Sequence, residues 1–397
     1  MKRPRAQAAL ATARRLLPWA IRALIAYALL AAFVPAQPRA PLGAPQTVQT
    51  DDPQLCMHTR LIDEVDEWKI QRSLALTREM GAGTIVEFFP WAYIEGSEGH
   101  YDWSSADRIV KQAQNQGIHI IARLGYVPDW ARKLDNASDE FTTLNTLPPA
   151  AYPEFAQFVA AFAARYAGEI DDLIIWNEPN IAFEWGYQKV DPAGYASLLQ
   201  AVYAPAHAAN PNVKILAAGL APTLEPVGSA VGLNDITYLD ELYDAGAQPY
   251  FDALAIHAYG FTYPYNDPPA FDKLNFRRAE LLRDVMVKHG DAAKPAFITE
   301  TGWNDDPHWA LAVSPSLRIG DTIGALDYAQ KNWNWADKLC FWALRYPVPT
   351  LSYPDGYTFI TTTFQLKPIY YAVQAFARGL EQDQALWLPA PVSTPSR

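Results

Sequence analysis

Along most of the chain, short apolar runs alternate with longer segments in which apolar residues recur every three or four positions. The short runs lie at 55–61, 84–89, 118–124, 173–176, 214–218, 252–258, 296–299 and 339–344. Runs of this length are typical of strands buried on both faces, as in a parallel sheet. The longer segments, at 64–80, 104–116, 153–166, 192–209, 235–245, 276–289, 317–335 and 368–378, have the spacing of helices.

Residues that begin and end helices support this division. Asp191 is expected as an N-cap with Pro192 in the first turn, and Gly117 and Gly290 follow two other helices. Eight strand–helix pairs in sequence predict an α/β fold, a closed (β/α)8 TIM barrel that forms one domain over 55–380. The alternative is an open doubly wound sheet, but no Gly-x-Gly-x-x-Gly follows a strand, so its nucleotide-binding form is not favoured.

The two ends of the chain differ from the central part. Basic residues precede an apolar run at 23–34 that ends in Val34-Pro35-Ala36, so residues 1–36 are expected to be a signal peptide or an N-terminal membrane anchor. An anchor would place Arg22 in the membrane, which is costly. Both alternatives predict an exported protein, either secreted or membrane-anchored with its domain outside the cytoplasm. Residues 37–54 are expected to form a Pro-rich linker, and residues 381–397 a C-terminal tail.

Composition excludes some classes of function. The net charge of −11 and the pI near 5.1 do not match a nucleic-acid-binding surface. No Cys/His cluster has the spacing of a zinc site, and no cofactor motif occurs. The only cysteines, Cys56 and Cys340, fall in the first and last strands, which a closed barrel makes neighbours. They are therefore expected either to form a disulfide that closes the barrel or to remain two buried thiols.

Two carboxylates stand where apolar strands open into loops. The fourth strand runs into Trp176-Asn177-Glu178-Pro179, and the seventh into Thr299-Glu300-Thr301-Gly302-Trp303. In this barrel, active sites lie at the C-terminal ends of the strands. Two facing carboxylates suit glycoside hydrolysis, in which one protonates the leaving oxygen and the other acts at the anomeric carbon. The alternative is that both are loop carboxylates or helix caps.

With these motifs the sequence resembles the clan A glycoside hydrolases, in which Asn-Glu-Pro ends strand four and a second Glu ends strand seven. The resemblance implies that Glu178 is the acid/base, that Glu300 is the nucleophile and that Asn177 bonds the sugar 2-hydroxyl. It covers residues 55–380. The phrases at 101–103, 127–130 and 367–371 are most similar to those of the β-xylosidase and iduronidase family.

The same resemblance extends to strands six and eight. His257-Ala258-Tyr259 matches a His-x-Tyr motif whose Tyr hydrogen-bonds the nucleophile, and Trp342 matches a Trp that forms a sugar platform. Core packing is the alternative for both His257 and Trp342. Loop tryptophans are further candidates to line the cleft or cover the core; they are Trp91, Trp130, Trp185 and Trp303, of which Trp303 is assigned to substrate binding.

One position departs from the clan. An Arg usually near the end of strand two is replaced by Glu87, and Arg60 and Arg123 are the candidates to take its place. Glu87 is expected either to raise the pKa of a neighbouring carboxyl or to pair with an arginine inside the barrel. Arg123 and Arg345 are candidates to meet a uronic acid carboxylate, or else they are structural.

The resemblance implies retaining hydrolysis of O-glycosidic bonds in oligo- or polysaccharides, without a metal or cofactor. Two other functions are alternatives. One is an inactive barrel that keeps the aromatic residues and only binds carbohydrate, although both carboxylates are present here. The other is a transglycosylase that uses the same carboxylate pair and transfers the sugar to an acceptor other than water.

Overall fold

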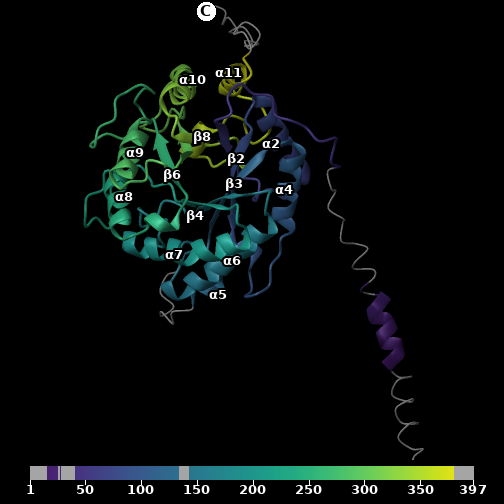
Figure 1. Ribbon diagram of the computed structural model, residues 1–397. Coiled ribbons are helices and arrows are strands. Elements are labelled where there is room, and N and C mark those ends of the chain that lie inside the picture. Colours follow the sequence, from purple (N-terminus) through teal and green to yellow (C-terminus); the bar gives the residue numbers. More distant parts are fainter. Residues whose placement is uncertain (1–15, 26, 28–40, 134–142, 380–397) are drawn as a thin grey trace, which may run out of the picture. The chain divides into compact units, whose positions relative to one another are not determined.

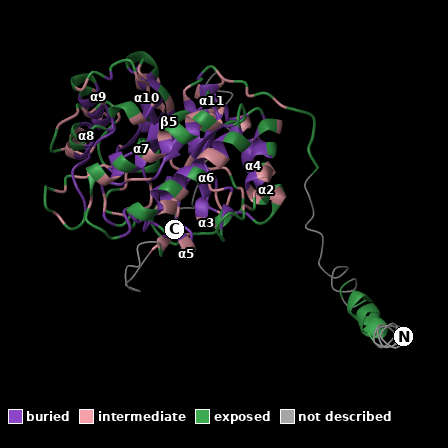
Figure 2. Cartoon of the chain, turned by 60° about the horizontal axis from the view of Figure 1, so that its bottom comes forward, coloured by how far each residue is buried: buried purple, intermediate pink, exposed green. Residues whose placement is uncertain are grey.

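The computed structural model describes residues 16–25, 27, 41–133 and 143–379. The chain divides into two units, Met1–Pro41 and Leu42–Arg397. In the first unit, residues 16–25 are helical and exposed, as Figure 2 shows in green. Within the described ranges, no helix has the length and apolar character needed to cross a membrane. Most of the apolar run at 23–34 and the tail at 381–397 fall outside those ranges.

The second unit is a barrel of eight parallel strands, as predicted (Figure 1). Each strand pairs with the next along the chain, and the last pairs with the first. The strands are β1 (Leu55–His58), β2 (Thr84–Pro90), β3 (His119–Gly125), β4 (Asp172–Ile175), β5 (Lys214–Ala217), β6 (Ala253–Tyr259), β7 (Ala296–Gly302) and β8 (Ala336–Phe341).

Helices surround the strands on the outside of the barrel (Figure 1). The main ones are α2 (Glu67–Met80), α4 (Ser104–Asn115), α6 (Tyr152–Arg165), α7 (Pro192–Ala209), α8 (Asp235–Asp244), α9 (Arg278–Lys288), α10 (Pro315–Asn332) and α11 (Pro368–Ala377). Two short helices, α3 (Trp91–Ile94) and α5 (Asp129–Arg132), lie in the loops after β2 and β3. Asp191 is the N-cap of α7 and Pro192 lies in its first turn, as predicted, although the Asp191 side chain makes no capping hydrogen bond. Its carboxylate lies instead against Gly194.

The segment before β1 belongs to the barrel unit from Leu42 onward. The Gln46 amide donates to the Asn115 carbonyl at 2.7 Å, and the Asp51 amide to the Ala377 carbonyl at 2.6 Å. The side chain of Asp52 is buried and accepts hydrogen bonds from the amides of Gln54 and Leu55. The extended segment expected as a linker over 37–54 is therefore bonded, from Gln46 onward, to the ends of α4 and α11 through these polar groups.

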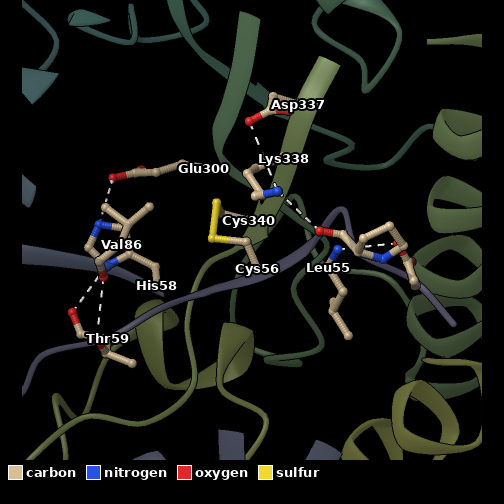
Figure 3. Close-up of a disulfide and its surroundings, with 11 residues drawn as sticks. Leu55, Cys56, His58, Thr59, Val86, Glu300, Asp337, Lys338 and Cys340 are labelled. Carbon is tan, nitrogen blue, oxygen red and sulfur yellow. Dashed lines mark hydrogen bonds and ion pairs between the residues drawn. A yellow bond between two sulfur atoms is a disulfide. The ribbon is translucent and has the colours of Figure 1, made fainter. Parts of the chain in front are cut away.

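A disulfide joins the first and last strands. Cys56 and Cys340 are register partners in the β1–β8 pair, with Cα atoms 4.1 Å apart, and their sulfur atoms are bonded (Figure 3). Of the two alternatives, the bridge is confirmed. Both cysteines are fully buried and belong to the layer of side chains that fills the barrel, together with Val86, Ile121, Ile174, Leu216, Ala253, Ala255 and Phe297.

Candidate active site

The loops after the strands hold unusual backbone conformations. Seven non-glycine residues in the described ranges have positive φ, and all seven lie in loops that follow the C-terminal ends of strands; they are Tyr126, Trp176, Glu178, Tyr187, Phe261, Leu351 and Phe364. Such conformations cost free energy and cluster at functional sites. Glu178 itself has φ 41°, and its amide donates to the Gly219 carbonyl at 3.0 Å. Residues with strained backbone therefore cluster at the C-terminal end of the barrel.

Glu300 lies in β7 and is held by two donors. The Tyr259 hydroxyl donates to Oε2 at 2.7 Å, and Arg123 Nη1 donates to Oε1 at 3.2 Å. Burial raises the pKa of Glu300, and the positive charges of His257 and Arg123 and the Tyr259 hydrogen bond oppose that rise. The predicted contact between Tyr259 and Glu300 is present, and its donors favour a carboxylate that is ionised when it reacts.

Arg123 takes the place of the arginine that strand two lacks. It comes from β3, and its Nη1 also donates to Asn177 Oδ1 at 2.7 Å. Its guanidinium lies 4.7 Å from the centre of the Phe88 ring. The other candidate, Arg60, pairs instead with Asp63 at 2.7 Å. One cation therefore links Asn177 to Glu300.

His257 contacts the other carboxylate. Its Nδ1 lies 2.8 Å from Glu178 Oε1 and 3.7 Å from Glu300 Oε2. Burial disfavours a charged ring, but Glu300 and Glu178 outweigh it and raise the pKa of His257. His257 therefore faces the site, as the motif predicts, and is not a packing residue. Gly219 makes this possible, because a Cβ there would lie 2.3 Å from the imidazole.

Glu178, His257 and Glu300 meet at one point. One ligand atom from each lies within 4.8 Å of the other two, so the carboxylates from β4 and β7 face one another across the barrel mouth. A cation would fit that spacing. However, Glu178 already bonds to His257, Glu300 bonds to Tyr259 and to the positive Arg123, and a neighbouring guanidinium disfavours a bound metal ion.

His58 is a site residue that the sequence analysis missed. Its Nε2 lies 3.6 Å from Glu300 Oε1 (Figure 3). Its ring centroid is 4.3 Å from that of Trp342. Burial, aided by Arg123 and Arg60, lowers the pKa of His58 well below its usual value, so the ring is neutral. Its Nδ1 faces the Thr59 carbonyl at 3.2 Å and must donate, which leaves Nε2 as an acceptor.

Glu184 is a second residue that was missed, on the loop after Glu178. Its Oε2 accepts from Asn145 Nδ2 at 3.1 Å, and it hydrogen-bonds Asn177. Burial, with repulsion from Glu178 as the next cause, raises the pKa of Glu184 to about 7. Neither His58 nor Glu184 stands in a recognisable motif, so only the folded barrel reveals them.

Trp342 follows β8, half-buried beside His58. Its Nε1 donates to the Tyr346 hydroxyl at 2.9 Å, which fixes the orientation of the indole. This position is compatible with the predicted sugar platform. Trp303 is different, because only 1% of it is exposed and its Nε1 donates to the Tyr263 carbonyl at 2.8 Å. It packs against Gly260 and Phe276 with no open face, so its assignment to substrate binding is wrong.

The other loop tryptophans also pack in the core. Trp91 and Trp185 are buried, and Trp130 stands edge-on to Trp91 with its Nε1 bonded to the Glu95 carbonyl. Of the alternatives left open for them, covering the core is the one the structure supports. Arg345 is likewise structural, because it is buried and forms an ion pair with Glu64.

Glu87 neither enters the cleft nor pairs directly with an arginine. The carboxylate accepts from the Thr59 hydroxyl and from the amides of Leu61 and Ile62. It therefore holds the loop between β1 and α2. Burial raises the pKa of Glu87 to about 7 in spite of these three donors.

Comparisons with known proteins agree with this description. A family model described as β-galactosidase matches residues 62–133, and no curated protein sequence matches the chain. The structure is similar to a family 39 glycoside hydrolase from Bacteroides cellulosilyticus, with 18% identity, TM-score 0.64, and coverage of 85% of this chain and 66% of that chain. This chain thus spans just under two thirds of that structure's length.

Two further solved structures show the same barrel. A monomeric β-xylosidase from Caulobacter crescentus has 17% identity and TM-score 0.59, with coverage of 83% of this chain and 69% of that chain. A glucosidase from Croceicoccus marinus has 14% identity and TM-score 0.61, with coverage of 85% and 70%. These likenesses show that the chain shares its fold with glycoside hydrolases, as the predicted resemblance implies.

Proposed function

We propose that the protein is a retaining glycoside hydrolase with Glu300 as nucleophile and Glu178 as acid/base. The observation that carries this proposal is the pair of facing carboxylates, with ligand atoms within 4.8 Å of one another at the C-terminal end of the barrel. Retaining enzymes place their two carboxyl groups about 5–5.5 Å apart, whereas inverting enzymes need room for a water molecule between them. The short spacing here favours direct attack by one carboxylate.

The surroundings of the two residues assign their roles. Glu300 receives hydrogen bonds from Arg123 and Tyr259, which stabilise the negative charge that a nucleophile needs. Glu178 is the more accessible of the two, with 17% of its side chain exposed against 8% for Glu300, and it contacts His257. In the first step Glu178 protonates the leaving oxygen while Glu300 attacks the anomeric carbon. In the second, Glu178 takes a proton from the water that releases the sugar.

Azide separates these two roles. Glu178→Ala should still form the glycosyl-enzyme from a 2,4-dinitrophenyl glycoside, whose leaving group needs no proton, but should then stall and show a burst. Added azide should restore turnover as a glycosyl azide of retained configuration. Glu300→Ala should lose nearly all turnover, and azide should give a product of inverted configuration, because it replaces the nucleophile.

Other outcomes have definite meanings. If azide restored neither variant, or if both azide products had the same configuration, the assignment of the two roles would be wrong. Wild-type protein that bound sugars but cleaved none would point to the carbohydrate-binding barrel. Products longer than the substrate would point to the transglycosylase.

We also propose that the protein acts outside the cytoplasm, as a secreted or membrane-anchored enzyme. The Cys56–Cys340 disulfide supports this, because structural disulfides persist in oxidising compartments. Mass spectrometry of the N-terminus, on protein recovered from medium and membrane fractions, tests it. A new N-terminus near residue 37 indicates a cleaved signal, an intact one in membranes indicates an anchor, and recovery only from cytosol contradicts the proposal.

A further inference from the structure

Aromatic side chains form a continuous row that leads away from Glu300. Tyr259, which bonds Glu300, contacts Phe261 at 5.9 Å and Tyr357 at 5.3 Å between ring centroids. Both of these contact Trp309, at 6.3 and 5.9 Å. Trp309 in turn stacks on Tyr353, with centroids 5.0 Å apart and an interplanar angle of 18°. The row crosses the loops that follow β6, β7 and β8.

A cavity of about 710 Å³ lies at the outer end of this row. Trp309 and Tyr353 supply its flat apolar surface, and Asp306, His308 and Ser352 supply hydrogen-bonding groups. Small-ligand sites are commonly ~300–1,000 Å³ and combine apolar walls with a few polar groups. The mixture is suited to a sugar, whose ring has an apolar face and whose rim carries hydroxyls.

An ion pair and several hydrogen bonds fix the positions of the two loops that line the cavity. Arg318 is buried, and its guanidinium binds Asp305 in one loop and the carbonyls of Tyr357 and Thr358 in the other. The Asp355 carboxylate accepts from the amides of Thr350 and Leu351. The cavity is therefore shaped before a ligand arrives, which lowers the entropic cost of binding.

Packing alone does not explain these features. Tyr353 keeps 47% of its surface exposed, Leu351 is 91% exposed, and the His308 side chain is 92% exposed. Phe261, in the inner part of the row, and Leu351, which lines the cavity, both have positive φ. A hydrophobic core would bury such rings and would not require strained backbone to present them.

We propose that this cavity is a sugar-binding subsite, which holds a unit of an oligosaccharide other than the unit that reacts with Glu300. This inference rests on the proposed function and deepens it: the substrate is a chain of several sugars. The aromatic row links the cavity to the nucleophile through Tyr259. A bound chain can follow the accessible rings of Phe261, Trp309 and Tyr353 between the two positions, whereas Tyr357 is buried.

The test compares substrates of one sugar with substrates of several. The probes are 4-nitrophenyl β-xyloside, β-glucoside, β-galactoside and β-mannoside, and the β-1,4-linked xylo-, cello- and manno-oligosaccharides of two to six units. Tyr353→Ala and Trp309→Ala should lower kcat/KM on the longer chains by about threefold to tenfold, the worth of one aromatic contact. They should leave the nitrophenyl glycosides unchanged. Trp309→Phe should restore most of the loss.

Tyr371→Ala serves as the matched control, since Tyr371 is a 39% exposed tyrosine on α11 outside the row. It should change neither class of substrate, and the thermal midpoints of all variants should confirm folding. Equal losses on short and long substrates, or none on either, would overturn the subsite.

Binding is measured separately, so that the two proposals can fail independently. Calorimetry on Glu300→Gln, alone and combined with Tyr353→Ala, uses the same oligosaccharides. Affinity that rises with chain length and falls on loss of Tyr353 supports the subsite even if the wild type cleaves nothing. Affinity that does not depend on Tyr353 overturns the subsite even if hydrolysis is proven.

Discussion

Arg123 shows how the same electrostatic task can be met from a different strand. A buried carboxylate that acts as a nucleophile, the role proposed for Glu300, needs a cation close by, and here β3 supplies it in place of β2, where Glu87 stands. Glu87 is able to occupy that position because it turns to the β1–α2 loop and takes three donors there. Because β3 lies next to β2 in the barrel, Arg123 can supply the positive charge that strand two lacks while Glu300 stays in place.

Removal of this cation should move the pH profile in a definite direction. Arg123 is one of the groups that oppose the raised pKa of Glu300, so Arg123→Ala should raise that pKa further. The nucleophile must be ionised, and the acidic limb of kcat/KM should therefore move to higher pH. Arg60→Ala is the control, because Arg60 pairs with Asp63 and should leave the limb in place. A limb that stays fixed in Arg123→Ala would show that the guanidinium does not act on the nucleophile.

At this scale the sequence identified the residues that stand in motifs and missed those that do not. Glu178 follows β4, and His257, Tyr259 and Glu300 lie in the C-terminal parts of β6 and β7; a closed barrel must bring such positions to one mouth. His58 also ends a strand, β1, but a single histidine carries no pattern. The error at Trp303 has another cause: a loop position does not specify which way an indole points, and the ring turned into the space left by Gly260.

At the scale of elements, the local sequence pattern predicted the helix and strand boundaries, except where pairing with a neighbouring strand determines where a strand ends. β7 was predicted to end at 299 but continues to Gly302, because Glu300, Thr301 and Gly302 pair with β6. β8 was predicted over 339–344 and instead ends at Phe341. An apolar run indicates buried residues but does not by itself indicate a strand. Residues 342–344 are apolar because the loop that contains them packs against the protein, although they form no strand.

Helix α10 offers a matched pair of glycines. A Cβ at Gly320 would meet nothing within 4 Å, whereas a Cβ at Gly324 would lie 2.3 Å from the ring of Tyr265. Gly320→Ala should stabilise the protein by about 0.5–1 kcal/mol through helix propensity. Gly324→Ala should instead destabilise it by about 1–3 kcal/mol, because the Tyr265 amide is bonded to Asp321 and the residue cannot easily retreat.

Urea denaturation of both variants beside the wild type measures the difference. The two substitutions have the same intrinsic effect on helix propensity, so the sign of the change isolates the contact with Tyr265. Equal stabilisation by both would mean that the loop before α9 moves freely away from α10.

At the scale of the molecule, closure of the barrel joins parts of the chain that are remote in sequence. The 42–54 segment bonds to the ends of α4 and α11, and β1 pairs with β8. The alternation of strands and helices predicted the closed barrel, since eight such units have this common solution. It did not predict the packed 42–54 segment, because proline content indicates an extended chain without saying what lies beside it.

The disulfide should contribute strongly to stability through this closure. It joins residues 284 apart in sequence, and for a loop of that length the chain-entropy relation gives about 5 kcal/mol. Dithiothreitol should therefore lower the urea midpoint of the wild type, whereas Cys56→Ala/Cys340→Ala should begin lower and not respond to the reductant. The reductant arm is needed because the double variant also loses two buried sulfur atoms, while the reduced wild type keeps them.

The same bond should matter for activity, because of what lies two residues after each cysteine. His58 ends β1 two residues after Cys56, and Trp342 lies two residues after Cys340, just beyond the end of β8; their rings meet beside Glu300. If reduction loosens the junction between β1 and β8, these two rings should separate first, so kcat/KM should fall at temperatures well below the unfolding midpoint. Full activity in the reduced protein up to that midpoint would show that the hydrogen bonds between β1 and β8 hold the junction closed by themselves. The disulfide would then stabilise the protein only by restricting the unfolded chain.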